Sequence, residues 1–287
     1  MAGDDHLKQI TFHNQKTTPI GMGTWRVGEG NAETTKQEIE SIHYGLNHGI
    51  NVIDTAEMYG EGLAETLVGK ATQSFDRSDF QIISKFYPYH ATPKLIKASL
   101  EKSLNRLQTD YLDLYLLHWR GETPLAETVA GLEDVKKAGY IKDWGVSNFD
   151  LSDLNELASV PDGLNCVVNE NLYNLTSRGV EYSILPWQKK HYMDFIGYSP
   201  FGSDKNEFLK LKPEIKDIAA QKHVTVFQLL LAWAIRNNDV LSIPKTSSLS
   251  HFEDNLKALE IEFTPDELDL LDSYYPKPTH ETPLDVI

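Results

Sequence analysis

Four side chains of this sequence are of the types that transfer and stabilise protons. In the segment INVIDTAEMYG (residues 50–60) an apolar run ends in Asp54, and Tyr59 follows five residues later. Lys85 ends the run FQIISK, and His118 ends the run YLDLYLLH. A carboxylate, a phenol, an amine and an imidazole can together protonate an oxygen while negative charge develops on it. The residue types therefore indicate acid–base catalysis, provided that the fold brings the four together.

The elements that must position these residues are visible as a repeating pattern. Eight short apolar runs, rich in β-branched and aromatic residues, occupy residues 20–25, 50–55, 80–85, 111–118, 143–148, 166–171, 194–200 and 240–245. Continuous apolar runs of this length are typical of strands buried on both faces, as in a parallel sheet. Segments with helical periodicity lie between or after them, at residues 32–49, 92–108, 123–139, 152–160, 213–223, 225–237 and 264–275. A further helix is expected around residues 251–258. Thr-Pro pairs at residues 92–93, 123–124 and 264–265 predict helix starts, and Glu267 could complete a capping box with Thr264.

Eight strand–helix units in about 250 residues predict a (β/α)8 barrel, which is an α/β fold of the TIM-barrel type. We expect residues 1–287 to form this single domain. The segment ITFHNQKTTPI (10–20) predicts an N-terminal β-hairpin that plugs the bottom of the barrel. The alternative is a doubly wound open sheet. The segment GMGTWRVGEG (21–30) argues against it, because it lacks the third glycine of a dinucleotide fingerprint.

In such a barrel the chemistry lies at the carboxyl ends of the strands. Every predicted strand ends in polar or aromatic residues: Trp25, Asp54, Lys85, His118, Ser147 with Asn148, Asn169 with Glu170, Tyr198 and Lys245. Since strands two, three and four are neighbours, we expect Asp54 and Lys85 to form a buried ion pair. Lys85 beside Tyr59 should favour the phenolate and lower the pKa of Tyr59 from its usual value of about 10. His118 would add a hydrogen-bond donor.

Taken singly, each of these residues also has a structural interpretation. Asp54 could cap a helix, Lys85 could lie on the surface, and His118 and Tyr59 could pack in the core. A Schiff-base role for Lys85 is a further alternative. The ten histidines show no His-x-x-x-His or His/Cys cluster, so we predict no metal site.

Composition restricts the classes of partner. The formal net charge is −15, and so acidic a surface repels nucleic acid and anionic membranes. The first residues, MAGDDHLKQI, lack the features of a secretory signal, and the longest apolar stretch, residues 229–235, is too short to span a bilayer. Cys166 is the single cysteine and cannot form an internal disulfide. We therefore expect a cytoplasmic protein without nucleic-acid or membrane partners.

Seven segments resemble, in order, the signatures of the aldo-keto reductases: GMGTW, DTAEMYG, ISKFYP, LDLYLLHW, WGVSNF, GYSPFG and SIPKTSS. The resemblance runs from about residue 9 to the end of the sequence. LYNLTSRGVEYSILPW and TPLDVI resemble a microbial subgroup that includes methylglyoxal-type reductases. This resemblance implies a monomeric, NADPH-dependent reductase of small aldehydes, ketones or dicarbonyls, with NADH as a weaker alternative cofactor.

The resemblance also implies a role for individual residues. Tyr59 matches the proton donor, Lys85 the residue that lowers its pKa, Asp54 the partner of that lysine, and His118 the residue that orients the carbonyl. The substrate mouth would be lined by Trp25, Tyr87 and Trp119. Cofactor contacts would come from Thr24, Trp25, Ser147, Asn148, Glu170, Tyr198, Ser199, Pro200, Phe201, Lys245, Thr246, Ser247, His251 and Asn255.

The family pattern assigns the residues of that cofactor set to different parts of the cofactor. Ser147, Asn148 and Glu170 match residues that grip the nicotinamide carboxamide, and Tyr198 matches the tyrosine that stacks on the ring. The segment 199–210 looks like the loop over the pyrophosphate. Lys245, Thr246 and Ser247 match the site of the 2′-phosphate, and Asn255 matches a contact to the adenine end.

Two positions depart from the family pattern. Glu170 stands where glutamine is common, and an ionised glutamate can accept a hydrogen bond from the carboxamide but cannot donate one. His251 stands where many members carry an arginine, and histidine is a weaker, pH-dependent partner for phosphate. The preference for NADPH over NADH is therefore open. A nicotinamide-binding regulatory or structural protein on the same fold is the alternative function, since the fold also serves as a channel subunit and as a lens crystallin.

Overall fold

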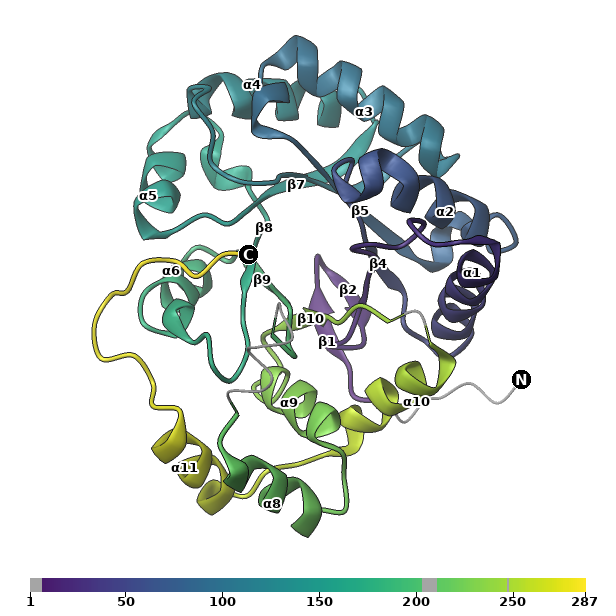
Figure 1. The fold of residues 1–287 in the computed structure, drawn as a ribbon. Helices are drawn as coiled ribbons and strands as arrows, with labels where there is room; N and C mark the ends of the chain where they lie inside the picture. The colour runs from purple at the N-terminus through teal and green to yellow at the C-terminus, as the bar shows by residue number, and fades with distance from the viewer. Residues whose placement is uncertain (1–6, 203–210, 247) are drawn as a thin grey trace.

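The barrel expected from the sequence is the architecture of the chain. The computed structural model describes residues 7–202, 211–246 and 248–287. Eight parallel strands form one sheet in the order β10-β9-β8-β7-β6-β5-β4-β3, and the helices surround it (Figure 1). Parallel bridges from Ile20 to Ser242 and from Gly23 to Lys245 join its two edges. The sheet is thus closed into a (β/α)8 barrel.

Each predicted apolar run overlaps one strand of the barrel. The strands are β3 (Met22–Gly23), β4 (Val52–Asp54), β5 (Gln81–Phe86), β6 (Leu112–Leu117), β7 (Ile141–Ser147), β8 (Val168–Leu172), β9 (Asp194–Tyr198) and β10 (Leu241–Ile243). In the register, Asp54 lies opposite Ile83, and Lys85 lies opposite Leu116. Because the strands are parallel, the polar residues at their carboxyl ends gather at one end of the barrel.

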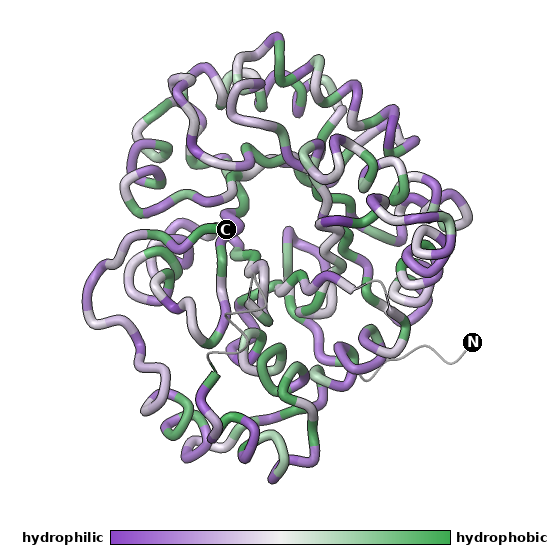
Figure 2. Tube along the Cα trace, in the orientation of Figure 1, coloured by the Kyte–Doolittle hydropathy of each residue, from purple (hydrophilic) through white to green (hydrophobic). Residues whose placement is uncertain are grey.

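Ten α-helices among the described residues cover the barrel. They are α1 (Ala32–Asn47), α2 (Leu63–Thr72), α3 (Pro93–Leu107), α4 (Leu125–Lys137), α5 (Leu151–Ser159), α6 (Ile184–Lys190), α8 (Pro213–Gln221), α9 (Val226–Ala234), α10 (Leu249–Lys257) and α11 (Pro265–Tyr274). Figure 2 shows α9 as strongly apolar, and its residues Gln228–Ala234 are buried. Within the described part of the chain, no helix has the length and apolar character that a membrane span requires.

The periodicity analysis did not identify two of these helices. In α2, seven of ten residues are buried, including Glu65 and the small residues Ala64, Gly69 and Ala71, so no single apolar face stands out. In α6, Pro186 stands in the first turn of a helix of only seven residues. A third difference is small: α4 begins at Leu125 with Pro124 at the cap position, one residue later than predicted.

The predicted N-terminal hairpin closes the bottom of the barrel. Strands β1 (Ile10–Phe12) and β2 (Gln15–Thr17) pair antiparallel. Ile10 and Phe12 pack in one cluster with the inward-facing residues Val52, Ile83, Leu114, Leu116, Val168, Ile196, Leu241 and Ile243. The ring of His13 bonds to Asp143 at 2.6 Å, and its backbone N–H donates to Asp194 at 2.7 Å. One end of the barrel is therefore filled, and the other remains for chemistry.

The capping box of α11 offers a local test of the fold. The Thr264 hydroxyl accepts from the Glu267 N–H at 3.3 Å, and the Glu267 carboxylate accepts from the Thr264 N–H at 2.7 Å. We expect Thr264→Ala to lower the free energy of unfolding by about 0.5–2 kcal/mol, measured by chemical denaturation. Asp269→Ala, at an exposed position of the same helix, is the control. Equal losses in both variants would contradict a specific contribution of the cap.

Candidate active site

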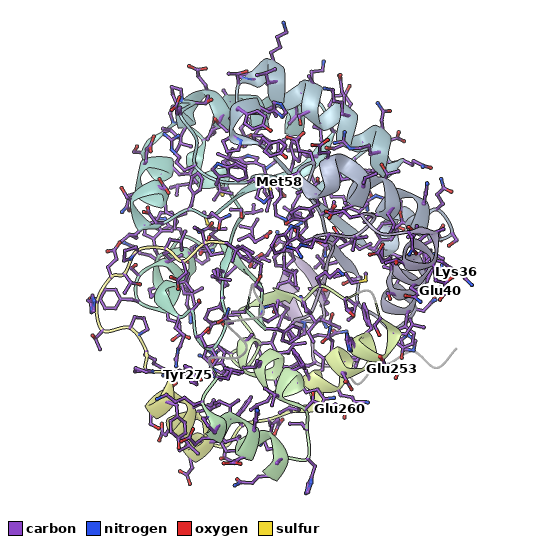
Figure 3. The ribbon with its side chains drawn as sticks, in the orientation of Figure 1. Lys36, Glu40, Met58, Glu253, Glu260 and Tyr275 are labelled. Carbon is purple, nitrogen blue, oxygen red and sulfur yellow. The ribbon has the colours of Figure 1, made fainter. Side chains whose placement is uncertain are left out.

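A cavity of about 430 Å³ opens at the carboxyl ends of the strands. Met58, which Figure 3 labels in the upper part of the barrel, is one of the residues that line it. The lining includes many residues predicted from the sequence: Thr24, Trp25, Asp54, Tyr59, His118, Trp119, Ser147, Asn148, Glu170, Tyr198, Ser199, Pro200, Phe201 and Lys245. Side chains from both edges of the sheet and from its middle thus meet around one space.

Lys85 lies at the floor of this site and is fully buried. Its ammonium donates to Asp54 at 2.5 Å, to the Thr55 carbonyl at 3.2 Å and to the Tyr59 hydroxyl at 3.4 Å. The carboxylate of Glu170 is 3.3 Å from the same nitrogen. Burial alone would lower the pKa of Lys85, but the charges of Asp54 and Glu170 raise it above its usual value. The geometry brings the predicted ion pair together and adds a second carboxylate, which the sequence did not indicate.

Tyr59 is held beside the ammonium by a tight turn. It begins the 3-10 helix η1 (Tyr59–Gly62), in which Gly60 and Glu61 have left-handed backbone angles of φ 56° and 53°. Its ring centre lies 5.3 Å from the Lys85 nitrogen. The expectation of a lowered pKa is wrong for this structure: burial raises the pKa of Tyr59 above its usual value, and the Lys85 charge only partly offsets that rise. The phenol therefore keeps its proton at neutral pH and is available as an acid.

His118 meets Tyr59 at the wall of the cavity. The two rings are edge to face with centres 5.8 Å apart, and the His118 backbone N–H donates to Phe86 at 3.1 Å. Burial, together with the nearby Lys85 charge, lowers the pKa of His118 to about 3. Its imidazole is consequently neutral in the ordinary pH range. It can hold an oxygen by a hydrogen bond, and it does not compete with Tyr59 as the proton donor.

A network of hydrogen bonds joins the ends of β7, β8 and β9. Asn148 has a left-handed backbone (φ 57°), and its side chain donates to the His118 carbonyl at 3.0 Å and to Ser147 at 3.1 Å. The Tyr198 hydroxyl donates to the Asn148 side chain at 2.7 Å, and Ser147 donates to the Glu170 carbonyl at 2.9 Å. A strained backbone held by several bonds is common where side chains must be fixed for function. These contacts give the cavity a rigid wall.

The other predicted residues fall into four groups. Thr24 is buried and donates to the Asp54 carbonyl at 2.8 Å, so it supports the site from behind. Tyr87 is outside the cavity lining, stacked on Tyr89 at 4.6 Å and edge-on to Trp119 at 6.0 Å. Thr246, His251 and Asn255 also lie outside the lining, with His251 exposed and Asn255 buried on α10. Ser247, and residues 203–210 of the predicted loop, lie outside the described residues.

The sequence analysis assigned no individual role to six lining residues: Gly23, Arg26, Met58, Gly202, Ile243 and Ile287. Met58 lies within the motif DTAEMYG, and a methionine in a turn has no distinctive sequence signature. Ile287 reaches the cavity because the chain after α11 returns to the barrel mouth, where Figure 1 marks the C-terminus. No local pattern in the sequence predicts such a return.

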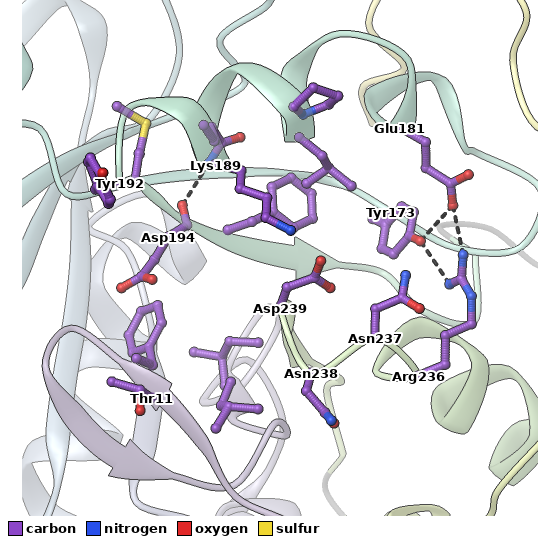
Figure 4. Close-up of a pocket in the computed structure, with 18 of the residues that line it drawn as sticks. Thr11, Tyr173, Glu181, Lys189, Tyr192, Asp194, Arg236, Asn237, Asn238 and Asp239 are labelled. Atoms are coloured by element: carbon purple, nitrogen blue, oxygen red, sulfur yellow. Dashed lines mark hydrogen bonds and ion pairs between the residues drawn. The ribbon is translucent and has the colours of Figure 1, made fainter.

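A second cavity, of about 730 Å³, lies at the opposite end of the barrel beside the hairpin (Figure 4). Several of its polar residues are joined to one another. Arg236 contacts Glu181 at 3.0 Å and Tyr173 at 2.9 Å, and Gln188 donates to the Asp194 carbonyl at 2.6 Å. These bonds tie β9 and the neighbouring loops together. Asp54, Tyr59 and His118 line the first cavity and not the second, so the first cavity is the candidate active site.

Comparison with known proteins gives a consistent result. Residues 19–276 match the aldo/keto reductase family. Methylglyoxal reductase YeaE of Escherichia coli (strain K12) is 41% identical over 284 residues, covering 98% of this chain and 99% of that protein. Glyoxal reductase of Bacillus subtilis (strain 168) is 30% identical over 268 residues, covering 92% and 91%.

A solved structure shares the whole architecture. An aldo-keto reductase of Klebsiella pneumoniae in complex with NADPH has a TM-score of 0.93 and 43% identity, covering 98% of this chain and 99% of that one. The family match extends from before β3 to the end of α11 and thus includes every barrel strand and the acid–base residues. The chain belongs to the aldo/keto reductase family.

Proposed function

We propose that this protein reduces small aldehydes, ketones or dicarbonyls with NADPH, and that Tyr59 supplies the proton. One observation carries the proposal: the Tyr59 hydroxyl lies 3.4 Å from a buried ammonium at the floor of an open cavity. That cation is itself fixed by Asp54 at 2.5 Å. A positioned acid beside a buried positive charge is suited to protonating an oxygen on which negative charge develops.

The residues around the cavity fit a nicotinamide cofactor, which supplies a hydride when bound. The Glu170 Oε2 atom is buried and has no hydrogen-bond partner among the described residues, so it can accept from a carboxamide NH2 group. Tyr198, fixed through its hydroxyl, lines the same space as Ser199, Pro200 and Phe201. Lys245, which follows β10, provides a cation for a phosphate group.

The chain's own residues act on the carbonyl oxygen. The neutral His118 ring orients that oxygen through a hydrogen bond, and the Tyr59 hydroxyl transfers its proton to it. Lys85 stabilises the phenolate left on Tyr59, because its positive charge favours the ionised phenol. Asp54 keeps the ammonium in place and compensates its burial.

The lining favours compact carbonyl compounds. Trp25, Met58 and Trp119 contribute large apolar side chains to a cavity of about 430 Å³. The relatives described above are named as methylglyoxal and glyoxal reductases. We therefore propose methylglyoxal and related dicarbonyls as substrates, and a panel of aldehydes tested with NADPH and with NADH is the direct experiment. Steady NADPH oxidation supports the enzyme, whereas cofactor binding without turnover would support a regulatory or structural role.

A Schiff-base lyase is a weaker candidate. Imine formation requires a neutral amine. Lys85 is held as an ammonium by two carboxylates, and its pKa is raised. Borohydride treatment in the presence of methylglyoxal should leave Lys85 unmodified, and covalent labelling of Lys85 would contradict the proposed mechanism.

His251 provides a test of cofactor choice. Its exposed side chain lies on α10, in the helix that follows Lys245 in the sequence. The arginine guanidinium can hold phosphate with two parallel hydrogen bonds, which an imidazole ring cannot form. We expect His251→Arg to tighten NADPH binding by about 1–2 kcal/mol and to leave NADH almost unchanged. Fluorescence quenching gives both dissociation constants, and equal tightening of the two cofactors would refute a role for residue 251 in reading the 2′-phosphate.

We further propose that the protein is a cytoplasmic monomer. The formal net charge of −15 favours repulsion between copies of the chain. Light scattering coupled to gel filtration measures the mass in solution, and a stable dimer would refute the monomer. Fractionation of the source cells tests the compartment.

A further inference from the structure

Glu170 gives the buried ammonium of Lys85 a second carboxylate. Asp54 on β4 and Glu170 on β8 contact the Lys85 nitrogen at 2.5 Å and 3.3 Å, and both carboxylates are 2% exposed. When both are ionised, the three residues carry one positive and two negative charges. A surplus charge that is buried without a counter-ion is unfavourable. Binding of one additional proton removes the surplus negative charge and therefore stabilises the cluster.

The ammonium also has more acceptors than protons. Lys85 carries three N–H bonds. Four oxygens surround it: Asp54 at 2.5 Å, the Thr55 carbonyl at 3.2 Å, Glu170 at 3.3 Å and the Tyr59 hydroxyl at 3.4 Å. Tyr59 is the most distant of the four. In the structure the three hydrogen bonds of Lys85 go to Asp54, Thr55 and Tyr59, and Glu170 makes an ion-pair contact. An ionised Glu170 can therefore gain an N–H bond only at the expense of one of these three, and the Tyr59 bond is the longest.

The surroundings of Glu170 single it out as the group whose protonation changes near neutral pH. Burial and the charge of Asp54 raise the pKa of Glu170 to about 8, although Lys85 opposes the rise. Burial also raises the pKa of Asp54, but Asp54 is the nearer counter-ion of Lys85, at 2.5 Å against 3.3 Å, so the additional proton is assigned to Glu170. The other titratable groups close to Glu170 are Tyr59 and Tyr198, whose pKa values are raised, and His118, whose pKa falls to about 3. From β7 the cavity receives only the non-titratable Ser147 and Asn148, and its remaining cations are Arg26 and Lys245.

We propose that protonation of Glu170 determines whether the Lys85 ammonium donates a strong hydrogen bond to the Tyr59 hydroxyl. Ionised Glu170 holds one N–H of Lys85 and leaves the Tyr59 hydroxyl with a weakened partner. Protonated Glu170 no longer attracts the ammonium, so Lys85 donates to Tyr59 and stabilises its phenolate as the proton leaves. Glu170 is thus a positioning residue that makes the reductase less active at alkaline pH. This inference rests on the proposed reductase function.

The kinetic experiment compares the pH dependence of kcat for methylglyoxal reduction in wild type and Glu170→Gln. We expect wild type to be at least ~5-fold slower at about pH 9.5 than at about pH 7, because a single ionisation near pH 8 limits the rate. Glu170→Gln should change by less than ~2-fold over that range, since glutamine cannot ionise. The control is Glu260→Gln, the same substitution at an exposed position that Figure 3 labels. An alkaline decline that persists in Glu170→Gln would overturn the proposal.

A second measurement needs no activity. Because the folded-state pKa of Glu170, about 8, lies above its ordinary value of 4.5, the protonated form stabilises the fold. That contribution is complete below about pH 4.5 and is lost as the pH rises to about 8. The Tm of wild type relative to Glu170→Gln should therefore fall across this window and stay constant above it. A Tm difference independent of pH would refute the titration of Glu170, even if the protein proved to have no reductase activity.

Infrared spectroscopy of the wild type covers the case in which Glu170→Gln does not fold. A buried protonated carboxyl group has its own C=O stretching band. We expect one such band to disappear as the pH rises through about 8, with no variant required. The absence of any carboxyl group titrating near this pH would overturn the proposal.

Discussion

Tyr59→Phe should lower kcat for carbonyl reduction by ~10²–10⁴-fold, the usual contribution of a positioned general acid. The variant keeps the ring that contacts His118 and removes only the hydroxyl 3.4 Å from Lys85. Folding and NADPH binding should therefore change little. Steady-state kinetics with methylglyoxal, together with the NADPH dissociation constant and the Tm, distinguish a chemical defect from a structural one.

Tyr192→Phe is the matched control for this experiment. Tyr192 is 96% exposed and belongs to the second cavity, so loss of its hydroxyl should leave kcat unchanged. If Tyr59→Phe retained near-normal kcat, Tyr59 would not be the proton donor. The reductase would then need another acid, and the structure offers none in His118, whose ring is neutral.

Lys85→Met should abolish reduction and also destabilise the fold. Lys85 is fully buried, and its removal leaves the buried carboxylates of Asp54 and Glu170 without a cation. Breaking a buried ion pair by removal of one partner costs about 3–5 kcal/mol. Calorimetry should therefore show a lower Tm, and the loss should be greatest where both carboxyl groups would otherwise be ionised.

A second substitution separates the two effects of Lys85→Met. The double variant Lys85→Met/Asp54→Asn removes one of the unpaired charges, so it should regain part of the lost stability. It should remain inactive, because Tyr59 still lacks its positive neighbour. An active Lys85→Met protein with unchanged Tm would show that the ammonium supports neither Tyr59 nor the fold.

The acid–base residues could be predicted from the sequence because they follow from strand order. β4, β5 and β6 are consecutive in the chain and adjacent in the barrel, so Asp54, Lys85 and His118 at or just after their ends must be neighbours. Contacts across the barrel are different. Glu170 reaches Lys85 although β6 and β7 separate their strands in the sheet. That contact depends on side-chain length and strand tilt, which no apolar pattern encodes.

Other features of the site depend on opposing electrostatic effects or on tertiary packing, neither of which can be read from the sequence. The predicted effect of Lys85 on Tyr59 had the right sign, but burial acts in the opposite direction and dominates. Tyr87 was expected in the substrate mouth, whereas the structure stacks it on Tyr89, outside the cavity lining. Met58 and Ile287 line the cavity instead. Turns and returning segments are positioned by tertiary packing, so their contents cannot be read from local periodicity.

The bridges from Ile20 to Ser242 and from Gly23 to Lys245 have a consequence for synthesis of the chain. β3 is made early and pairs with β4, but its other neighbour is made only near the end of translation. At ~5–20 residues per second, the intervening chain takes roughly 10–40 s to emerge from the ribosome. During that interval β3 presents unpaired backbone groups, and such an edge attracts other chains. Susceptibility to aggregation is therefore concentrated in the nascent protein, because the finished barrel has no open edge.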